Sequence, residues 1–203
     1  MRVKLIRPQF RIDNRSIFFK GQLLNSNGLD AGVLLKEKLR LTVGYYWLTD
    51  NLDTYKKNVD NIDIERNLQL KYGSINTEVI YKNTRFISLG MPLDFAFGKN
   101  TLQYKNSATG EVQSTASGII FLTDFGLSAT LKPTRWIGVK GILGYRKTIY
   151  NGVKDFKLDG IFTSIGLSID IREIIKDVQM FQLKKKYKGN RNSIETAVDL
   201  ITD

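Results

Sequence analysis

The chain has 203 residues, 42% hydrophobic and 25% charged, with only three prolines, which is the composition of a folded protein and not of a disordered chain. It contains no cysteine and no histidine, which excludes disulfides, thiolate metal sites, cysteine nucleophiles and the most common general base. The net charge of +11 is spread along the chain without a helix-turn-helix, zinc-finger or RNA-binding signature, so we expect no nucleic acid partner.

Hydrophobic side chains recur with a period of two along most of the chain, which predicts strands and not helices. We expect residues 1–14 to form an N-terminal periplasmic segment, and Arg7, Arg11 and Asp13 there interrupt any apolar run of the kind a secretory signal needs. Eight strands are predicted to follow, each long enough for the ~9–11 tilted residues that cross a bilayer. Their expected ranges are 15–24, 28–36, 39–49, 66–82, 84–98, 117–131, 135–149 and 158–171.

Two local features refine this pattern. In the range 66–82 the apolar residues change parity near Gly73, which predicts a β-bulge there. The connections between strands also alternate in length: those at 36–38, 82–84 and 132–134 are tight, whereas those at 50–65, 99–116 and 150–157 are longer and polar. Short turns on one rim and long loops on the other are typical of outer-membrane barrels, with the long loops outside and both termini in the periplasm.

The two faces of the predicted strands differ in size and polarity. One face carries large apolar residues almost without a gap, and the other carries glycine, serine and isolated charges, which fits a narrow, packed interior. The charges assigned to this interior are Lys20, Asp30, Lys36, Arg40, Lys71, Glu78, Asp94, Asp124, Lys140 and Arg146. Aromatic residues near the strand ends predict a lipid-facing girdle formed by Tyr45, Trp47, Phe95, Phe97, Phe121 and Tyr145.

The sequence therefore predicts an all-β protein: a closed, eight-stranded, antiparallel up-and-down transmembrane barrel over residues 15–171, located in an outer membrane. Eight strands enclose an interior that side chains just fill, so paired charges are expected to plug it. Two alternatives stay open, a narrow pore and a soluble lipid-binding barrel of lipocalin type.

One long loop is rich in carboxylates: it contains Asp50, Asp53, Asp60 and Asp63. Their spacing does not match that of a calcium-binding loop, so we expect no metal and no cofactor.

Three stretches resemble the small outer-membrane β-barrel proteins of Bacteroidota, which have the eight-stranded barrel architecture of OmpA. They are RFISLGMPLDFAFG (85–98), LSATLKPTRWIGVKGILGYRKTI (127–149) and LDGIFTSIGLSIDI (158–171). The resemblance implies an outer-membrane location and, for some members, a role as a subunit of a larger envelope complex. It carries no catalytic signature.

The period of the pattern changes after residue 171. One helical face carries four apolar residues, Ile174, Ile175, Val178 and Phe181. Residues 172–203 are therefore expected to form a partly helical periplasmic extension that docks on a partner.

We expect a non-enzymatic outer-membrane protein, a structural or accessory subunit of a complex, whose partners are membrane lipids and other outer-membrane or periplasmic subunits. A lipid-modifying barrel enzyme would need the histidine that this chain lacks.

Overall fold

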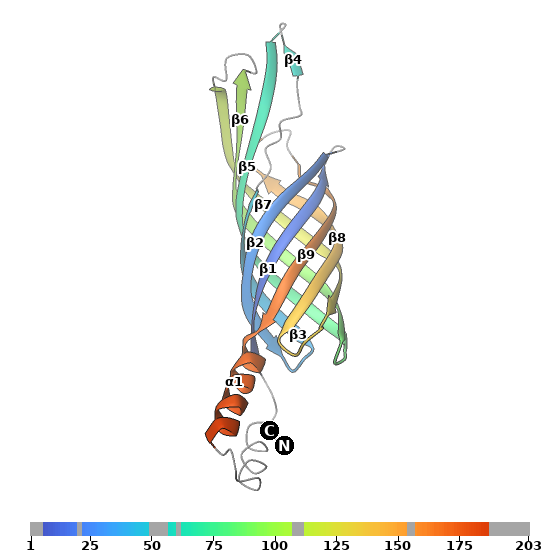
Figure 1. Ribbon diagram of the computed structural model, residues 1–203. Coiled ribbons are helices and arrows are strands. Elements are labelled where there is room, and N and C mark those ends of the chain that lie inside the picture. Colours follow the sequence, from blue (N-terminus) through green and yellow to red (C-terminus); the bar gives the residue numbers. More distant parts are fainter. Residues whose placement is uncertain are drawn as a thin grey trace.

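The computed structural model describes residues 6–19, 22–48, 57–59, 62–106, 112–153 and 157–186 (Figure 1). The strands are β1 (Ile6–Phe19), β2 (Gln22–Leu35), β3 (Leu39–Leu48), β4 (Lys57–Val59), β5 (Ile62–Asn83), β6 (Ile87–Asn106), β7 (Val112–Leu131), β8 (Ile137–Asn151) and β9 (Gly160–Asp170). A single helix, α1 (Ile171–Lys186), follows β9 within this part of the chain. No helix among the described residues is both long and apolar enough to span a bilayer.

Eight of these strands form a closed barrel in which neighbours in sequence pair antiparallel. β1 pairs with β9, and β3 pairs with β5 from Leu39–Val79 to Trp47–Lys71, which closes the sheet. The short strand β4 pairs only with the outer end of β5 and is not part of the wall. Closure removes the free backbone edges that lipid cannot solvate. The predicted up-and-down barrel of eight strands is confirmed.

The first two strands begin earlier than the sequence analysis predicted. β1 starts at Ile6, so most of the expected N-terminal segment 1–14 belongs to the barrel, and β1 and β2 replace the predicted ranges 15–24 and 28–36. Residues 25–27, which separate the first two predicted strands, lie inside β2 opposite β1. Their side chains are satisfied across the sheet, because Asn14 Nδ2 donates to Asn27 Oδ1 at 2.7 Å and Ser16 Oγ donates to Asn25 Oδ1 at 2.6 Å.

The bulge predicted near Gly73 is also wrong. β5 is one continuous strand, and its ladder with β6 runs without a shift from Ile64 to Ile80; the irregularity lies between Ile80 and Lys82. Even-numbered side chains, from Leu68 to Ile80, point inward throughout. The apparent change of parity has another cause: the interior is apolar at one end of this strand and polar at the other.

Three strands continue beyond the rest of the barrel wall. β3 stops pairing with β5 at Trp47–Lys71 and β8 stops pairing with β7 at Ile120–Asn151, whereas β5, β6 and β7 extend further (Figure 1). The long loop predicted at residues 99–116 is shorter than expected, because β6 reaches Asn106 and β7 begins at Val112. The period of two persists there with inverted polarity, because Lys99 points outward and Leu102 is buried.

The helix α1 begins directly where β9 ends and lies at the opposite end of the barrel from this extension (Figure 1). Asp170 stabilises its first turn by accepting a hydrogen bond from the Glu173 N–H at 3.4 Å. Arg7 of β1 forms ion pairs with both Asp170 and Glu173. The end of the barrel and the start of the helix are therefore held together by one small charge cluster.

Candidate functional site: an apolar wall around a filled interior

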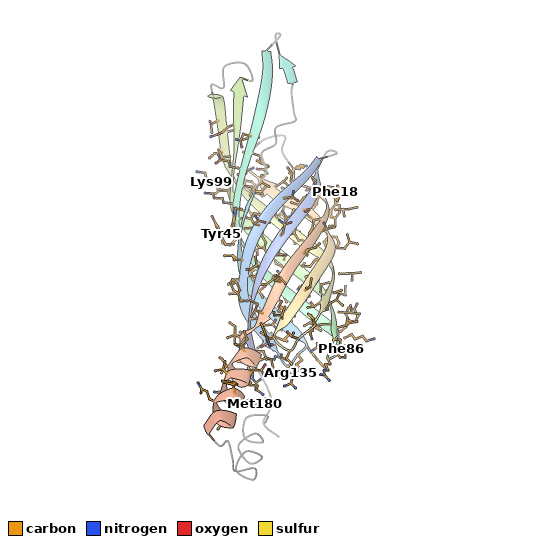
Figure 2. All side chains as sticks on the ribbon, viewed as in Figure 1. Phe18, Tyr45, Phe86, Lys99, Arg135 and Met180 are labelled. Carbon is orange, nitrogen blue, oxygen red and sulfur yellow. The ribbon has the colours of Figure 1, made fainter. Side chains whose placement is uncertain are left out.

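The outer surface of the barrel is apolar, and its interior is polar over the membrane-spanning part. Phe125 is 54% exposed and Ile165 is 69% exposed, whereas Lys140 and Asp124 are only 1% and 2% exposed. Side chains cover the outside of the wall along the whole barrel (Figure 2). A soluble lipid-binding barrel has the opposite arrangement, with an apolar cavity inside and a polar outside. That alternative is therefore wrong for this chain.

The outward-facing residues also mark how far the membrane reaches. On β6 the outward positions are apolar from Ile87 to Phe97, which is a span of 11 residues, and then change to Lys99. This span matches the ~9–11 tilted residues that cross a bilayer. On β5 and β7 the same change occurs at Lys71 and Ser117, both exposed. The three extended strands thus leave the lipid at one level and continue into solvent.

The six residues predicted as a girdle all lie on the outer face of the wall. Tyr45, Phe95, Phe97, Phe121 and Tyr145 are exposed, and Trp47 is half-buried. Several contact another aromatic ring: Tyr45 with Trp47 at 6.1 Å, Phe121 with Tyr150 at 6.2 Å and Phe125 with Tyr145 at 6.0 Å between ring centroids. Anchoring at the lipid headgroups remains a prediction for these side chains.

Eleven charged side chains of the described residues are at most 6% exposed. One of them, Asp170, pairs with Arg7 at the end of the barrel, and the other ten, five cationic and five anionic, lie deeper in the interior. These ten are Arg11, Arg15, Arg40, Lys140 and Arg146, with Asp13, Asp30, Glu78, Asp94 and Asp124. Seven of them were among the predicted interior charges. Lys36 and Lys71 were wrongly placed there: Lys36 is exposed in the turn between β2 and β3, and Lys71 is exposed on the outer face of β5. Lys20 lies outside the described residues.

Sequence reasoning missed Arg11, Asp13 and Arg15, because it placed the start of the barrel too late. Their signal was present as a period of two, since these three buried residues alternate with the exposed Ile12 and Asn14. Ile17 continues this inward row and, although apolar, is only 1% exposed.

Arg15 is at the centre of the interior network. Its guanidinium lies 2.6 Å from Asp94 Oδ2, 3.2 Å from Asp124 Oδ2 and 3.1 Å from Asp13 Oδ2. It also donates to the Tyr46 hydroxyl at 2.5 Å and lies 4.0 Å above the centre of that ring. Charge-assisted hydrogen bonds of this kind compensate the large cost of burying a charge.

The neighbouring pairs complete the network around Arg15. Arg146 binds Asp124 with two nitrogens, at 2.7 Å from Nε to Oδ1 and 2.5 Å from Nη2 to Oδ2. Arg11 binds Asp30, whose Oδ2 accepts from Arg11 Nε at 2.7 Å. The Tyr46 hydroxyl lies 2.9 Å from both oxygens of Asp30. Each of these arginines therefore has a carboxylate partner of its own.

A second cluster forms around Glu78, nearer the end of the barrel that carries α1. Lys140 Nζ donates to Glu78 Oε2 at 2.7 Å, and Arg40 and Ser128 bond the same carboxylate. Arg40 Nε also donates to Gln9 Oε1 at 2.8 Å. One anion here faces two cations, while Arg15 faces several anions, so the ten charges cancel only when both clusters are taken together.

The end of the interior that lies under the extended strands is apolar. Buried residues from the strands meet the segment between β8 and β9, which contributes Val153 and Leu158. The cluster comprises Leu24, Tyr46, Leu68, Leu70, Tyr72, Ala96, Leu102, Ile120, Leu122, Val153 and Leu158. Within this cluster, Tyr46 and Tyr72 stack at 5.1 Å between ring centroids. These two rings form the boundary with the charged part of the interior, because Arg15 lies against Tyr46 and Arg146 lies against Tyr72. The interior is thus filled by ion pairs and closed by an apolar cap.

The residues predicted to dock a partner lie on α1 beyond the barrel. Ile175, Val178 and Phe181 are 50%, 51% and 71% exposed, and Ile174 is half-buried. The loop carboxylates Asp50, Asp53 and Asp60 lie outside the described residues, as does the side chain of Asp63. Within the part of the chain that is described, no group of three or more acidic residues is arranged to hold a metal ion.

No protein-family model and no curated protein matches this chain. Solved structures do match its fold. The N-terminal β-barrel domain of Pseudomonas aeruginosa OprF has a TM-score of 0.52 at 11% identity, over 80% of this chain and 96% of that one. A major outer membrane protein from Thermus thermophilus has a TM-score of 0.54 at 12% identity, over 80% of this chain and 98% of that one. The shared fold and the apolar wall together make the chain an eight-stranded outer-membrane β-barrel protein.

Proposed function

We propose that the protein is a non-enzymatic structural or accessory subunit of an outer-membrane complex, and that α1 presents a periplasmic docking surface. The observation that carries this proposal is the apolar stripe of α1, defined as Ile171, Ile174, Ile175, Val178 and Phe181. These residues follow the helical spacing of three and four, and four of them are at least 39% exposed. An exposed apolar stripe on a helix beyond the lipid is a typical site for a protein partner.

The interior of the barrel supports a structural role over a pore. Its ten buried charges pair with one another, and the apolar cap lies over them. Moving an ion through this path would require breaking several buried pairs at once, each costly to leave unpaired. The resemblance to the barrels of Bacteroidota, some of which are complex subunits, supports the same proposal.

We expect the purified barrel to show no stepwise ion conductance in planar lipid bilayers. The physical reason is that ion pairs and apolar side chains occupy its interior. Single-channel recording checks this, with a large porin as the positive control for insertion and detection. Reproducible conductance steps from the folded barrel would contradict a filled interior and favour the narrow-pore alternative.

Replacing Val178 and Phe181 together by serine is expected to abolish recovery of a partner while leaving the barrel folded. The stripe loses its two most exposed apolar side chains, and α1 lies outside the wall. A site-specific photocrosslinker at Ile175, introduced into wild type and variant, measures the partner contact in cells. The control replaces Gln179 and Gln182, exposed polar residues of the same helix, by serine.

Both helix variants must show the same heat-modifiable gel mobility as wild type, which reports that the barrel is folded. Crosslinks that persist unchanged in the Val178/Phe181 variant would overturn the docking role of the stripe, and so would equal loss in the glutamine control. Loss in the stripe variant alone, with a folded barrel, supports it.

A further inference from the structure

A cleft of about 300 Å³ lies at the periplasmic rim of the barrel, between two tight turns and α1. Arg85 and Phe86 come from the turn between β5 and β6, and residues 132–136 form the turn between β7 and β8. Asp177 of α1 completes the lining. Figure 2 shows Phe86 and Arg135 at the same end of the barrel as α1. Three chain segments far apart in the sequence thus build one hollow.

Backbone hydrogen bonds hold these segments in place. The Lys132 N–H donates to the Phe86 carbonyl at 2.7 Å, which joins the two turns. The Asp170 N–H donates to the Trp136 carbonyl at 2.8 Å, which ties the start of α1 to the second turn. Within that turn, Thr134 Oγ1 accepts from the Ile137 N–H at 3.0 Å. These hydrogen bonds of the fold therefore join the two turns to each other and to the start of α1.

The cleft is cationic on the side of the turns and acidic on the side of the helix. Arg85, Lys132 and Arg135 face it from the turns, and Asp177 is the sole carboxylate among the described residues that line it. Lys132 also lines a smaller adjoining cavity, together with Arg7 and Arg40. Burial, and then the positive charges of Arg7 and Arg40, lower the pKa of the Lys132 ammonium. The three cationic side chains on this side of the cleft favour an anion there.

The cleft also lies at the edge of the apolar wall, where the headgroups of the surrounding lipid are expected. Ile87 and Leu131, 41% and 56% exposed, are the first apolar residues of the wall above the two turns. Phe86 and Trp136 are exposed aromatics at the turns themselves. Aromatic side chains prefer the interface between hydrocarbon and water, and arginine binds phosphate through its planar fork of donors. The position and the charges point to the same class of ligand.

We propose that this cleft binds the headgroup of a glycerophospholipid that carries both a phosphate and a primary amine. Arg85 and Arg135 take the phosphate, and Asp177 takes the ammonium group. The acyl chains continue upward past Phe86 along the apolar wall, which is where lipid already lies. The cleft thereby adds a selective lipid site to the general lipid contact of the barrel.

Native mass spectrometry of the whole protein tests this site, with equal amounts of phosphatidylethanolamine and phosphatidylglycerol offered in detergent. Wild type is expected to retain phosphatidylethanolamine preferentially. The double variant Arg85→Gln/Arg135→Gln should lose roughly tenfold in retention of both lipids, because it removes two charge-assisted phosphate contacts. Asp177→Asn should keep lipid binding and lose the preference for the amine.

The matched control is Lys38→Gln/Lys82→Gln, which removes two exposed cations of the same rim that do not line the cleft. It should retain lipids as wild type does. The proposal is overturned if the arginine variant binds like wild type, if this control loses lipid equally, or if Asp177→Asn keeps the preference. Complete displacement of the lipid by excess inorganic phosphate would assign the site to free phosphate and overturn it too. All variants are compared after heat-modifiable mobility shows that they are folded.

Discussion

Replacing Arg15 by methionine is expected to destabilise the barrel by about 3–5 kcal/mol, the cost of leaving a buried charge without its partner. Arg15 is the cation that binds Asp94, at 2.6 Å, and it also contacts Asp13 and Asp124. When Arg15 is removed, Asp13 still pairs with Arg11, and Asp124 still pairs with Arg146. Asp94 then has no ion pair left with any of the described cations. Urea titration of the barrel in lipid vesicles, followed by heat-modifiable mobility, measures the loss.

A second substitution shows whether the loss comes from the unpaired charge. The double variant Arg15→Met/Asp94→Leu removes both partners, and replacing a buried pair by apolar residues is often close to neutral. We therefore expect the double variant to regain most of the stability that Arg15→Met loses. Lys147→Gln is the control, since its ion pair with Asp159 lies at the surface and contributes little. A double variant that is no more stable than Arg15→Met would contradict the pairing argument.

Replacing Leu127 by arginine is expected to cost about 2–4 kcal/mol, and replacing Ser117 by arginine at most about 1 kcal/mol. Both residues lie on the outer face of β7, and both are exposed. Leu127 lies in the apolar part of the wall, whereas Ser117 lies where the extended strands have left the lipid. An arginine at an exposed site costs little in water, so only the surrounding membrane produces this difference.

The same urea titration in vesicles measures both variants against wild type. Equal costs for the two substitutions would contradict the level assigned to the membrane. A larger cost at Ser117 than at Leu127 would reverse the assignment and place the extended strands in lipid.

Local alternation along the chain was enough to predict the number of barrel strands and the face that each presents to lipid for most of the wall. The exposed Leu93, Phe125 and Ile165 and the buried Asp94, Asp124 and Lys140 follow that pattern directly. The prediction depended only on residues two apart, because successive side chains of a strand point to opposite faces.

The same reasoning failed where the environment of one face changes along a strand. Leu68 and Leu70 point inward like Glu78, but they enter an apolar cap where Glu78 enters a charge cluster. Polarity alone therefore suggested a bulge in β5 that does not exist. At residues 25–27, turn-forming residues lie inside β2, because β1 supplies hydrogen-bond partners across the sheet.

The sequence alone thus predicted a closed barrel of eight strands with an apolar outer surface, because the alternation of apolar and polar residues is a property of neighbours in the chain. The pairing of the interior charges could not be predicted in this way, since it depends on the folded barrel. Arg15 meets Asp94 and Asp124 from 79 and 109 residues away, and only the closure of the barrel and its stagger bring them together. The level at which the wall leaves the lipid and the turns that meet α1 likewise depend on the relative height of strands, which no local pattern records.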